Sequence, residues 1–189
     1  MCIGLCLYLL HAGDRQSILM KMESFMQIRK AKKEDIEEIM EIFSGARIFM
    51  AATGNPHQWG EQAWPPRDLI LQDIKEEKSY LCFDEDGKVL GSFFYDFGID
   101  VEPDYEQIEE GSWERDIAYG VVHRIAVRNQ TKGVGTFCLN WAYKQCKLLR
   151  IDTHEDNKVM QNLLNKLGFV AKGKVYVGPK KEERIAFEK

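Results

Sequence analysis

The fold is decided by the segment His123-Arg-Ile-Ala-Val-Arg-Asn-Gln-Thr-Lys-Gly-Val-Gly135, which continues through Thr136 to Trp141. Its first five residues predict a strand, a polar loop with two glycines follows, and an amphipathic helix comes next. The first turn of a helix has unpaired N–H groups and a partial positive charge. The segment therefore predicts an anion site, and a phosphate is its natural ligand.

The two glycines, Gly133 and Gly135, are expected to bring the loop backbone close to this anion. Without a Cβ they can take left-handed angles, so that N–H groups reach phosphate oxygens. The residues expected to hold the anion are Gln130, Thr131, Lys132, Gly133, Val134, Gly135 and Thr136.

At Gln130-Thr-Lys-Gly133-Val-Gly135 the chain resembles the GNAT superfamily of N-acetyltransferases, whose acetyl-CoA pyrophosphate loop reads Gln/Arg-x-x-Gly-x-Gly/Ala. A second match is Arg150-Ile-Asp-Thr-His-Glu-Asp-Asn157, followed by a helix and Lys166-Leu-Gly-Phe169. The resemblance is close over about 118–169 and looser from Met26 to the C-terminus. It implies a GNAT-type α/β fold, which is a mixed, mostly antiparallel sheet with a central parallel β-α-β pair, flanked by helices.

The hydrophobic periodicity predicts the same order of elements. Gly168 suits the position just after a helix end, and Asp156 or Asn157 the position just before a helix start. Strands are expected at 26–31, 80–84, 89–95, 118–127, 148–153, 174–177 and 184–188, and helices at about 33–46, 67–77, 134–146 and 158–167.

The composition indicates one soluble domain, because 189 residues with 44% hydrophobic and 30% charged side chains can bury a core. A net charge of -4 argues against nucleic acid as a partner. The five cysteines show no C-x-x-C pair, so we expect neither a disulfide framework nor a metal site. A cytoplasmic location fits best, and a homodimer is left open.

The N-terminal residues 1–25 are expected to be a disordered extension of a domain at 26–189, with Met22 or Met26 as the functional start. The apolar run from Cys2 to Leu10 lacks a basic flank and is too short to span a bilayer. No membrane association is therefore predicted.

The resemblance implies acetyl-CoA as co-substrate, with its pantetheine arm along the strand before the loop. Backbone groups of Ile125, Ala126 and Val127 would pair with the arm as a neighbouring strand would. A backbone N–H in this stretch would polarise the thioester carbonyl. Asn157 is either a ligand contact or a helix cap.

An acetyl acceptor needs a base, because an alkyl amine is neutral in only about one molecule in a thousand at pH 7, which costs roughly 4 kcal/mol. Asp152 stands where some family members carry a general-base glutamate, five residues before Asn157. We expect Asp152 to take the proton directly or through water. His123 and His154 are rivals, and the alternative for Asp152 is an ion pair with Arg124 or Arg150.

One departure from the family concerns the acid that protonates the leaving thiolate. The family often has a Tyr before Gly-Phe, where this chain has Leu164-Asn165. Tyr119 or Tyr143 could substitute only if folding brings it near. A non-catalytic acyl-CoA sensor or interaction module is therefore the alternative function.

The acceptor is expected to be a small-molecule or peptide amine, bound in the regions before the cofactor strand. The acidic segment 100–116 holds eight acids and one base, so it is either an attractor for a cationic amine or a solvated loop. The aromatic residues expected at the acceptor pocket, unless they belong to the core, are Trp59, Trp64, Tyr105 and Trp113.

A nicotinamide dehydrogenase is a rival reading, because Gly133-Val-Gly135 lies between a strand and a helix and Asp152 ends the next strand. Cys138 occupies the place of the third glycine, however, and no further βαβ repeat is present.

Overall fold

The structure is a computed structural model that describes residues 25–60, 63–114 and 117–189. The strands are β1 (Gln27–Lys30), β2 (Ser79–Phe83), β3 (Val89–Gly98), β4 (Tyr119–Val127), β5 (Leu149–Thr153), β6 (Val170–Val177) and β7 (Glu182–Glu188). The helices are α2 (Ile36–Ala52), α3 (His57–Gly60), α4 (Arg67–Lys75), α5 (Val134–Cys146) and α6 (Lys158–Lys166).

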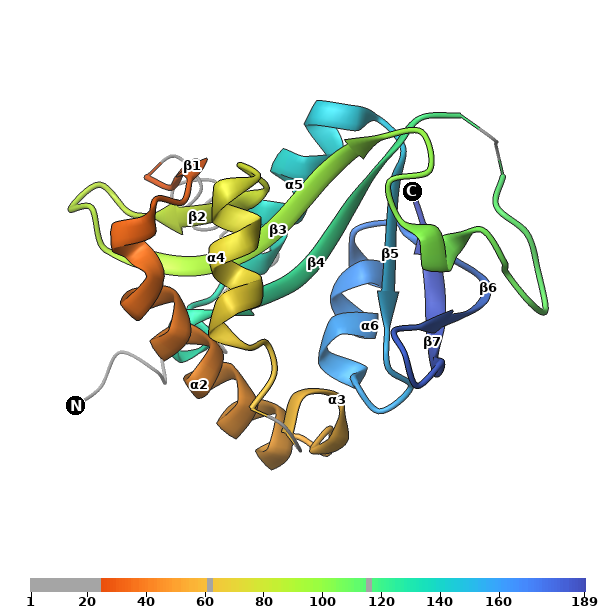
Figure 1. Cartoon of the computed structure of the whole chain (residues 1–189), viewed down its shortest axis with the longest axis horizontal. Helices are drawn as coiled ribbons and strands as arrows, with labels where there is room; N and C mark the ends of the chain where they lie inside the picture. The colour runs from red at the N-terminus through yellow and green to blue at the C-terminus, as the bar shows by residue number, and fades with distance from the viewer. Residues whose placement is uncertain (1–24, 61–62, 115–116) are drawn as a thin grey trace, which may run out of the picture.

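Within the described residues, the strands form one seven-stranded sheet in the order β1-β2-β3-β4-β5-β7-β6 (Figure 1). The β4–β5 pair is parallel and α5 connects its two strands, whereas every other neighbouring pair is antiparallel. The predicted mixed, mostly antiparallel sheet with a central parallel β-α-β pair is confirmed.

Helices cover both faces of this sheet. On one face α5 and α6 pack on side chains such as Phe93, Val122 and Ile151. On the other face α2 and α4 pack on side chains that include Leu81 and Ala126. The buried stripe of α2 has the helical spacing read from the sequence, and it consists of Ile36, Ile39, Ile42, Phe43 and Ala46.

Several element boundaries differ from the prediction, most of all the end of α2, which reaches Ala52 instead of about residue 46. β3 continues to Gly98, β6 begins already at Val170, and the short helix α3 was not predicted. β6 is an edge strand whose only buried residue is Val175. Because neither face of its first residues is buried, the sequence there lacks the alternation that marks a strand.

Both predicted ends of α6 are confirmed. The Asn157 side chain accepts a hydrogen bond from the Met160 N–H at 3.0 Å, as a helix cap does. At the other end Gly168 has a left-handed φ of +82°, and the Phe169 N–H donates to the Leu164 carbonyl at 3.0 Å.

The expectation of a disordered N-terminal extension concerns residues of which all but Phe25 lie outside the described part of the chain. Across the described ranges, no helix combines the length and the apolar character that crossing a membrane requires.

The substitution Gly168→Ala is expected to lower the free energy of unfolding by about 1 kcal/mol, because alanine is disfavoured at positive φ. A Cβ at Gly168 would meet nothing within 4 Å, so the cost is conformational only. The control is Gly45→Ala inside α2, where a Cβ also meets nothing within 4 Å, and this change should stabilise by about 0.5–1 kcal/mol. Urea denaturation measures both. Equal changes in the free energy of unfolding of the two variants would contradict a left-handed φ at Gly168.

Candidate functional site

The site is organised by two parallel strands that separate. The β4–β5 ladder contains only the pairs Gly120–Leu149 and Val121–Arg150. Beyond these pairs β4 continues along β3 and β5 continues along β7, and the two ribbons diverge toward the end where α3 lies (Figure 1). The edge of β4 that faces β5 therefore has no strand partner past Val121, so an extended ligand could pair with its backbone.

β4 also contains a bulge that the sequence did not predict. His123 pairs with Phe94 and Ala126 with Ser92, so β4 has one residue more than β3 between these pairs. Arg124, inside the bulge, has a φ of +52°, which costs a non-glycine residue about 1–2 kcal/mol. Such strain persists only where the surrounding structure holds it.

The bulge reverses the alternation of side chains along β4. Before the bulge, Val121 faces the side of the sheet opposite to Val122, whose side chain packs under α5 and α6. After the bulge, Ile125 and Val127 pack on the α5 side, and Ala126 packs under α2.

The predicted anion loop begins with a 3-10 turn at Arg128–Gln130 and leads into α5. Gly133 precedes α5 with a φ of +86°, which confirms the left-handed angle expected there. The same expectation for Gly135 is wrong, because Gly135 lies in the first turn of α5 and is not among the glycines with positive φ. A Cβ on Gly135 would lie 3.0 Å from Leu163 Cδ2, so its small size permits α5 and α6 to pack closely.

The loop is held to the sheet and to α2 through Arg128. Its Nε donates to the Val89 carbonyl at 2.8 Å and its Nη2 to Glu38 Oε1 at 2.8 Å. The Thr131 hydroxyl donates to the Arg128 carbonyl at 2.8 Å. These bonds fix the path of the chain at the point where the first N–H groups of α5 are free.

A cluster of titratable side chains lies beside the separation of β4 and β5. The Tyr105 hydroxyl donates to Asp152 Oδ1 at 2.7 Å. His123 lies between two carboxylates, with Nδ1 3.7 Å from Asp152 Oδ1 and Nε2 2.7 Å from Glu102 Oε2. The short contact with Glu102 is not aligned as a hydrogen bond. Arg184 Nε is 3.8 Å from Asp152 Oδ2.

The alternative expectation, an ion pair of Asp152 with Arg124 or Arg150, is wrong. Arg124 binds Asp73, and Arg150 binds Glu188 with its Nε 3.0 Å from Oε1. Asp152 is therefore available to the His123 cluster.

The electrostatics of the cluster follow from burial and contacts. Burial raises the pKa of Tyr105 well above its ordinary value, and the charge of Asp152 and the bond to it act in the same direction. Tyr105 therefore stays protonated and donates to Asp152. Burial also raises the pKa of Glu102, but the His123 contact and the Asp104 N–H outweigh it, so the pKa of Glu102 is lowered. His123 thus has a carboxylate beside each of its two ring nitrogens.

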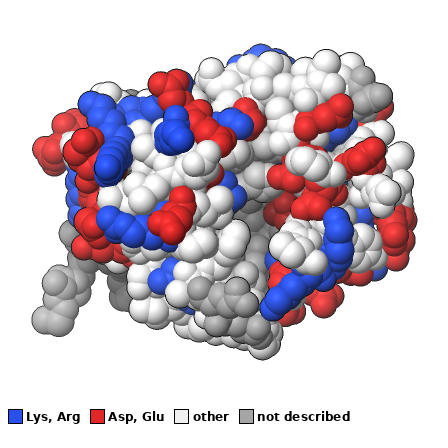
Figure 2. All heavy atoms as spheres, in the orientation of Figure 1, with Lys and Arg blue, Asp and Glu red and all other residues white. Residues whose placement is uncertain are grey.

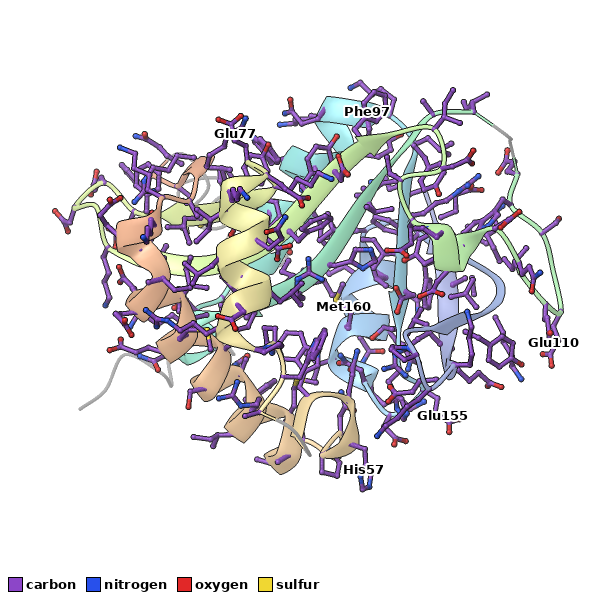
Figure 3. The ribbon with its side chains drawn as sticks, in the orientation of Figure 1. His57, Glu77, Phe97, Glu110, Glu155 and Met160 are labelled. Atoms are coloured by element: carbon purple, nitrogen blue, oxygen red, sulfur yellow. The ribbon has the colours of Figure 1, made fainter. Side chains whose placement is uncertain are left out.

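His154 lies apart from this cluster. Its Nδ1 accepts from the Asp156 N–H at 3.1 Å in the turn after β5. It lines a pocket of about 280 Å³ whose other lining residues are His57, Gln58, Glu155, Glu182, Glu183, Arg184 and Ile185. Figure 3 shows His57 and Glu155 at the same end of the molecule. One of these lining residues, Arg184, also contacts Asp152 of the cluster.

The four aromatic residues expected at an acceptor pocket do not form one group. Trp113 Nε1 donates to the Tyr105 carbonyl at 2.8 Å, so these two residues lie together, and Tyr105 contacts Asp152. Trp59 packs against Phe43 of α2, with ring centroids 5.6 Å apart. Trp64 is exposed, and its carbonyl accepts from Arg47.

Three of the eight acids of the acidic segment pair with lysines of the last hairpin. Asp104 pairs with Lys181, Glu110 with Lys174, and Glu114 with Lys172. In Figure 2 acidic side chains gather on the part of this face formed by β6, β7 and the segment after β3. Since these pairs compensate charge locally, the segment offers a weaker attraction for a cation than its composition suggests.

Neither tyrosine considered as a replacement acid lies at the open end of the strand pair. Tyr119 is at the paired end, with Arg150 Cζ 4.0 Å from its ring centroid. Tyr143 is near the end of α5, with Lys189 Nζ 4.5 Å from its ring centroid. Leu164 itself is fully buried.

Glu102, Arg184 and Asp73 join the site region without having been predicted. Glu102 is one of eight acids in its segment and Arg184 lies in a charged hairpin, so no local pattern distinguishes them. Among the described residues, no group of three or more His, Cys, Asp or Glu is arranged to hold a metal ion.

A scan against models of protein families found no match, and a search of curated proteins found none. Among solved structures, the chain is similar to a GNAT-family acetyltransferase from Streptococcus agalactiae, with a TM-score of 0.77 and 34% identity, covering 87% of this chain and 94% of that chain. The PaiA N-acetyltransferase from Thermoplasma acidophilum, in complex with coenzyme A, has a TM-score of 0.60 and 16% identity, covering 87% and 98%. An N-acetyltransferase from Staphylococcus aureus has a TM-score of 0.55 and 21% identity, covering 87% and 97%. The last two likenesses concern the fold alone.

The substitution Tyr105→Phe is expected to lower the free energy of unfolding by about 1.5–3 kcal/mol, because a half-buried carboxylate loses its hydroxyl donor. The control is Tyr176→Phe, whose hydroxyl contacts Glu109 on the surface and which should change stability by less than about 0.5 kcal/mol. Urea denaturation at neutral pH measures both. Equal losses of unfolding free energy would show that the Tyr105–Asp152 hydrogen bond contributes no more to stability than the surface bond of Tyr176.

Proposed function

This chain belongs to the GNAT family of acetyltransferases, and from that premise we propose that it transfers an acetyl group from acetyl-CoA to a primary amine by direct attack in a ternary complex. Family membership supports acyl transfer as the reaction class. The observation that carries the finer proposal is the separation of β4 and β5 after two residue pairs, with the Gly133 loop and the His123 cluster beside it.

The donor would be held by main-chain groups. The N–H groups between Gln130 and Thr136 bind the pyrophosphate at the start of α5, and the left-handed angle at Gly133 supports this arrangement. The pantetheine arm pairs with backbone groups of Ile125, Ala126 and Val127 along the free edge of β4. A main-chain N–H in this stretch polarises the thioester carbonyl.

Asn157 has a smaller part in this proposal. Its Oδ1 caps α6, and its Nδ2 donates to Gln58 Oε1 at 3.0 Å. Because both of these side-chain contacts lie within the protein, we assign Asn157 first to the helix cap.

The proton of the attacking amine would go to the Asp152–His123 pair. An imidazole with an ordinary pKa near 6.5 is a better acceptor at neutral pH than a carboxylate with an ordinary pKa near 4. We therefore assign the proton to His123, whose ring nitrogens lie beside Asp152 and Glu102. Asp152, which the sequence suggested as the base, acts through this contact.

The amine nitrogen attacks the thioester carbon, the C–S bond breaks, and the thiolate leaves. His123 can return the proton to the sulfur, so atoms and charge balance without a further acid. A thiol with an ordinary pKa near 8.5 is a tolerable leaving group at neutral pH. Leu164 in place of a family tyrosine is thus compatible with turnover.

The acceptor would reach the cluster through the pocket lined by His57, Gln58 and the Glu182–Ile185 strand segment. Arg184 connects this pocket to Asp152. A small-molecule or peptide amine fits such an entrance, and the paired acidic segment does not argue for a strongly cationic one.

The substitution Gly133→Ala is expected to weaken acetyl-CoA binding about 5- to 30-fold, because a left-handed alanine costs about 1–2 kcal/mol and the loop relaxes away from the diphosphate. The control is Gly87→Ala, which has a φ of +79° in the turn between β2 and β3. It should lose stability with unchanged affinity. Isothermal titration calorimetry measures the affinity of both variants for acetyl-CoA. Equal affinities would show that the loop at Gly133 does not bind the donor.

The substitution His123→Gln is expected to lower kcat/KM about 10²- to 10⁴-fold, because loss of a general base costs about this factor. Asp152→Asn should act in the same direction and Glu77→Gln, far away on the surface, should not. The rate of thiol release with a panel of amines measures kcat/KM for each variant.

Two results would change the assignment. A larger effect of His154→Gln than of His123→Gln would make His154 the base. Tight acetyl-CoA binding without turnover of any amine class would favour a non-catalytic acyl-CoA sensor.

A further inference from the structure

A buried ion pair joins α4 to the bulge of β4. Arg124 Nε lies 3.1 Å from Asp73 Oδ2, and Arg124 Nη2 lies 3.0 Å from Asp73 Oδ1, so the guanidinium binds the carboxylate through two parallel hydrogen bonds. Asp73 is only 5% exposed. Such a bidentate contact fixes the orientation of the guanidinium relative to the carboxylate as well as their distance.

The same guanidinium is fixed from a second side. Arg124 Cζ lies 4.5 Å from the centroid of the Phe94 ring, and the neighbouring His123 ring lies 5.7 Å from that centroid. His123 and Arg124 are consecutive, yet both side chains contact Phe94. This is possible because the bulge interrupts the alternation of β4.

Stability alone does not account for this pair. Burial raises the pKa of Asp73 although Arg124 lowers it, and burial lowers the pKa of Arg124 although Asp73 raises it. In both groups desolvation outweighs the attraction of the partner. A buried pair of this kind is weak support for stability and is retained in some proteins for structural specificity.

The pair holds the part of the β4 backbone that lies beside the proposed donor site. Arg124 and Ile125 are the residues that the β3–β4 register leaves without a partner residue, and they directly follow His123. They lie where β4 has already separated from β5. Their N–H groups are therefore those whose direction depends most on the shape of the bulge.

We propose that Asp73 and Arg124 are positioning residues, which hold the bulge so that main-chain N–H groups at Arg124 and Ile125 point at the thioester carbonyl of the donor. This inference rests on the proposed function. Neither side chain touches the acyl group. Removal of a single oxyanion donor lowers kcat by about 10²- to 10³-fold in enzymes that rely on one, and loosening the bulge should cost a part of this.

The test is the carbonyl stretch of bound acetyl-CoA labelled with ¹³C at the acetyl carbonyl, measured by isotope-edited infrared spectroscopy without an acceptor. In the unmodified protein we expect a shift to lower frequency relative to free acetyl-CoA. In Asp73→Asn the stretch should return toward the free value, kcat should fall about 10- to 100-fold, and the Kd for CoA, which lacks the carbonyl, should stay within about threefold.

The matched control is Asp35→Asn. It breaks a similar bidentate pair at the start of α2, in which Arg29 Nη1 lies 2.7 Å from Asp35 Oδ2 and Arg29 Nη2 lies 2.9 Å from Asp35 Oδ1. It should lower stability and leave the carbonyl stretch and kcat unchanged. Should Asp73→Asn fail to fold, Arg124→Lys keeps the charge, loses the bidentate geometry, and should give an intermediate carbonyl shift.

The outcomes separate the two proposals. If the unmodified protein binds no acetyl-CoA, the proposed function fails. If it binds acetyl-CoA and both Asp73→Asn and Arg124→Lys leave the carbonyl stretch and kcat as in the unmodified protein, the pair is a brace between α4 and the sheet, and the positioning role is overturned. Recovery of the shift in Asp73→Glu would support the role.

Discussion

The structure depends on the limited pairing of two neighbouring parallel strands. β4 and β5 share only two residue pairs before they part. Backbone N–H and C=O groups at such a place have lost their usual partners, and burial without partners is costly. An extended ligand can supply these partners, which is why the proposed donor site is placed at this separation.

The fold was largely predictable because its signals are local. The stripe of α2, the hairpin between β2 and β3, and the glycine after α6 each follow from residues within one turn or one strand. The bulge at Arg124 was not predictable, since nothing in His123-Arg124-Ile125 breaks the strand pattern. It depends on Asp73, which is 51 residues away in the sequence.

The candidate site was predicted in part for the same reason. The loop at Gly133 and the cap at Asn157 have short motifs, and the structure places them as expected. The alternative expectation for Asp152, an ion pair with Arg124 or Arg150, was wrong, because residues from other strands and loops, Tyr105 and His123, contact it. Glu102 was missed because selection among eight neighbouring acids requires the position of His123.

The segment after β3 has a further consequence for the outer edge of the sheet. Glu109 and Lys174 exchange two main-chain hydrogen bonds of 2.8 Å, so this segment adds a short stretch of ladder to β6. An uncovered edge strand is a template on which a second molecule can add its own strand, which leads to aggregation. Here the chain occupies part of that edge itself, and lysine–glutamate pairs flank the contact. The acidic segment thus occupies backbone groups of β6 that would otherwise be open to strand addition.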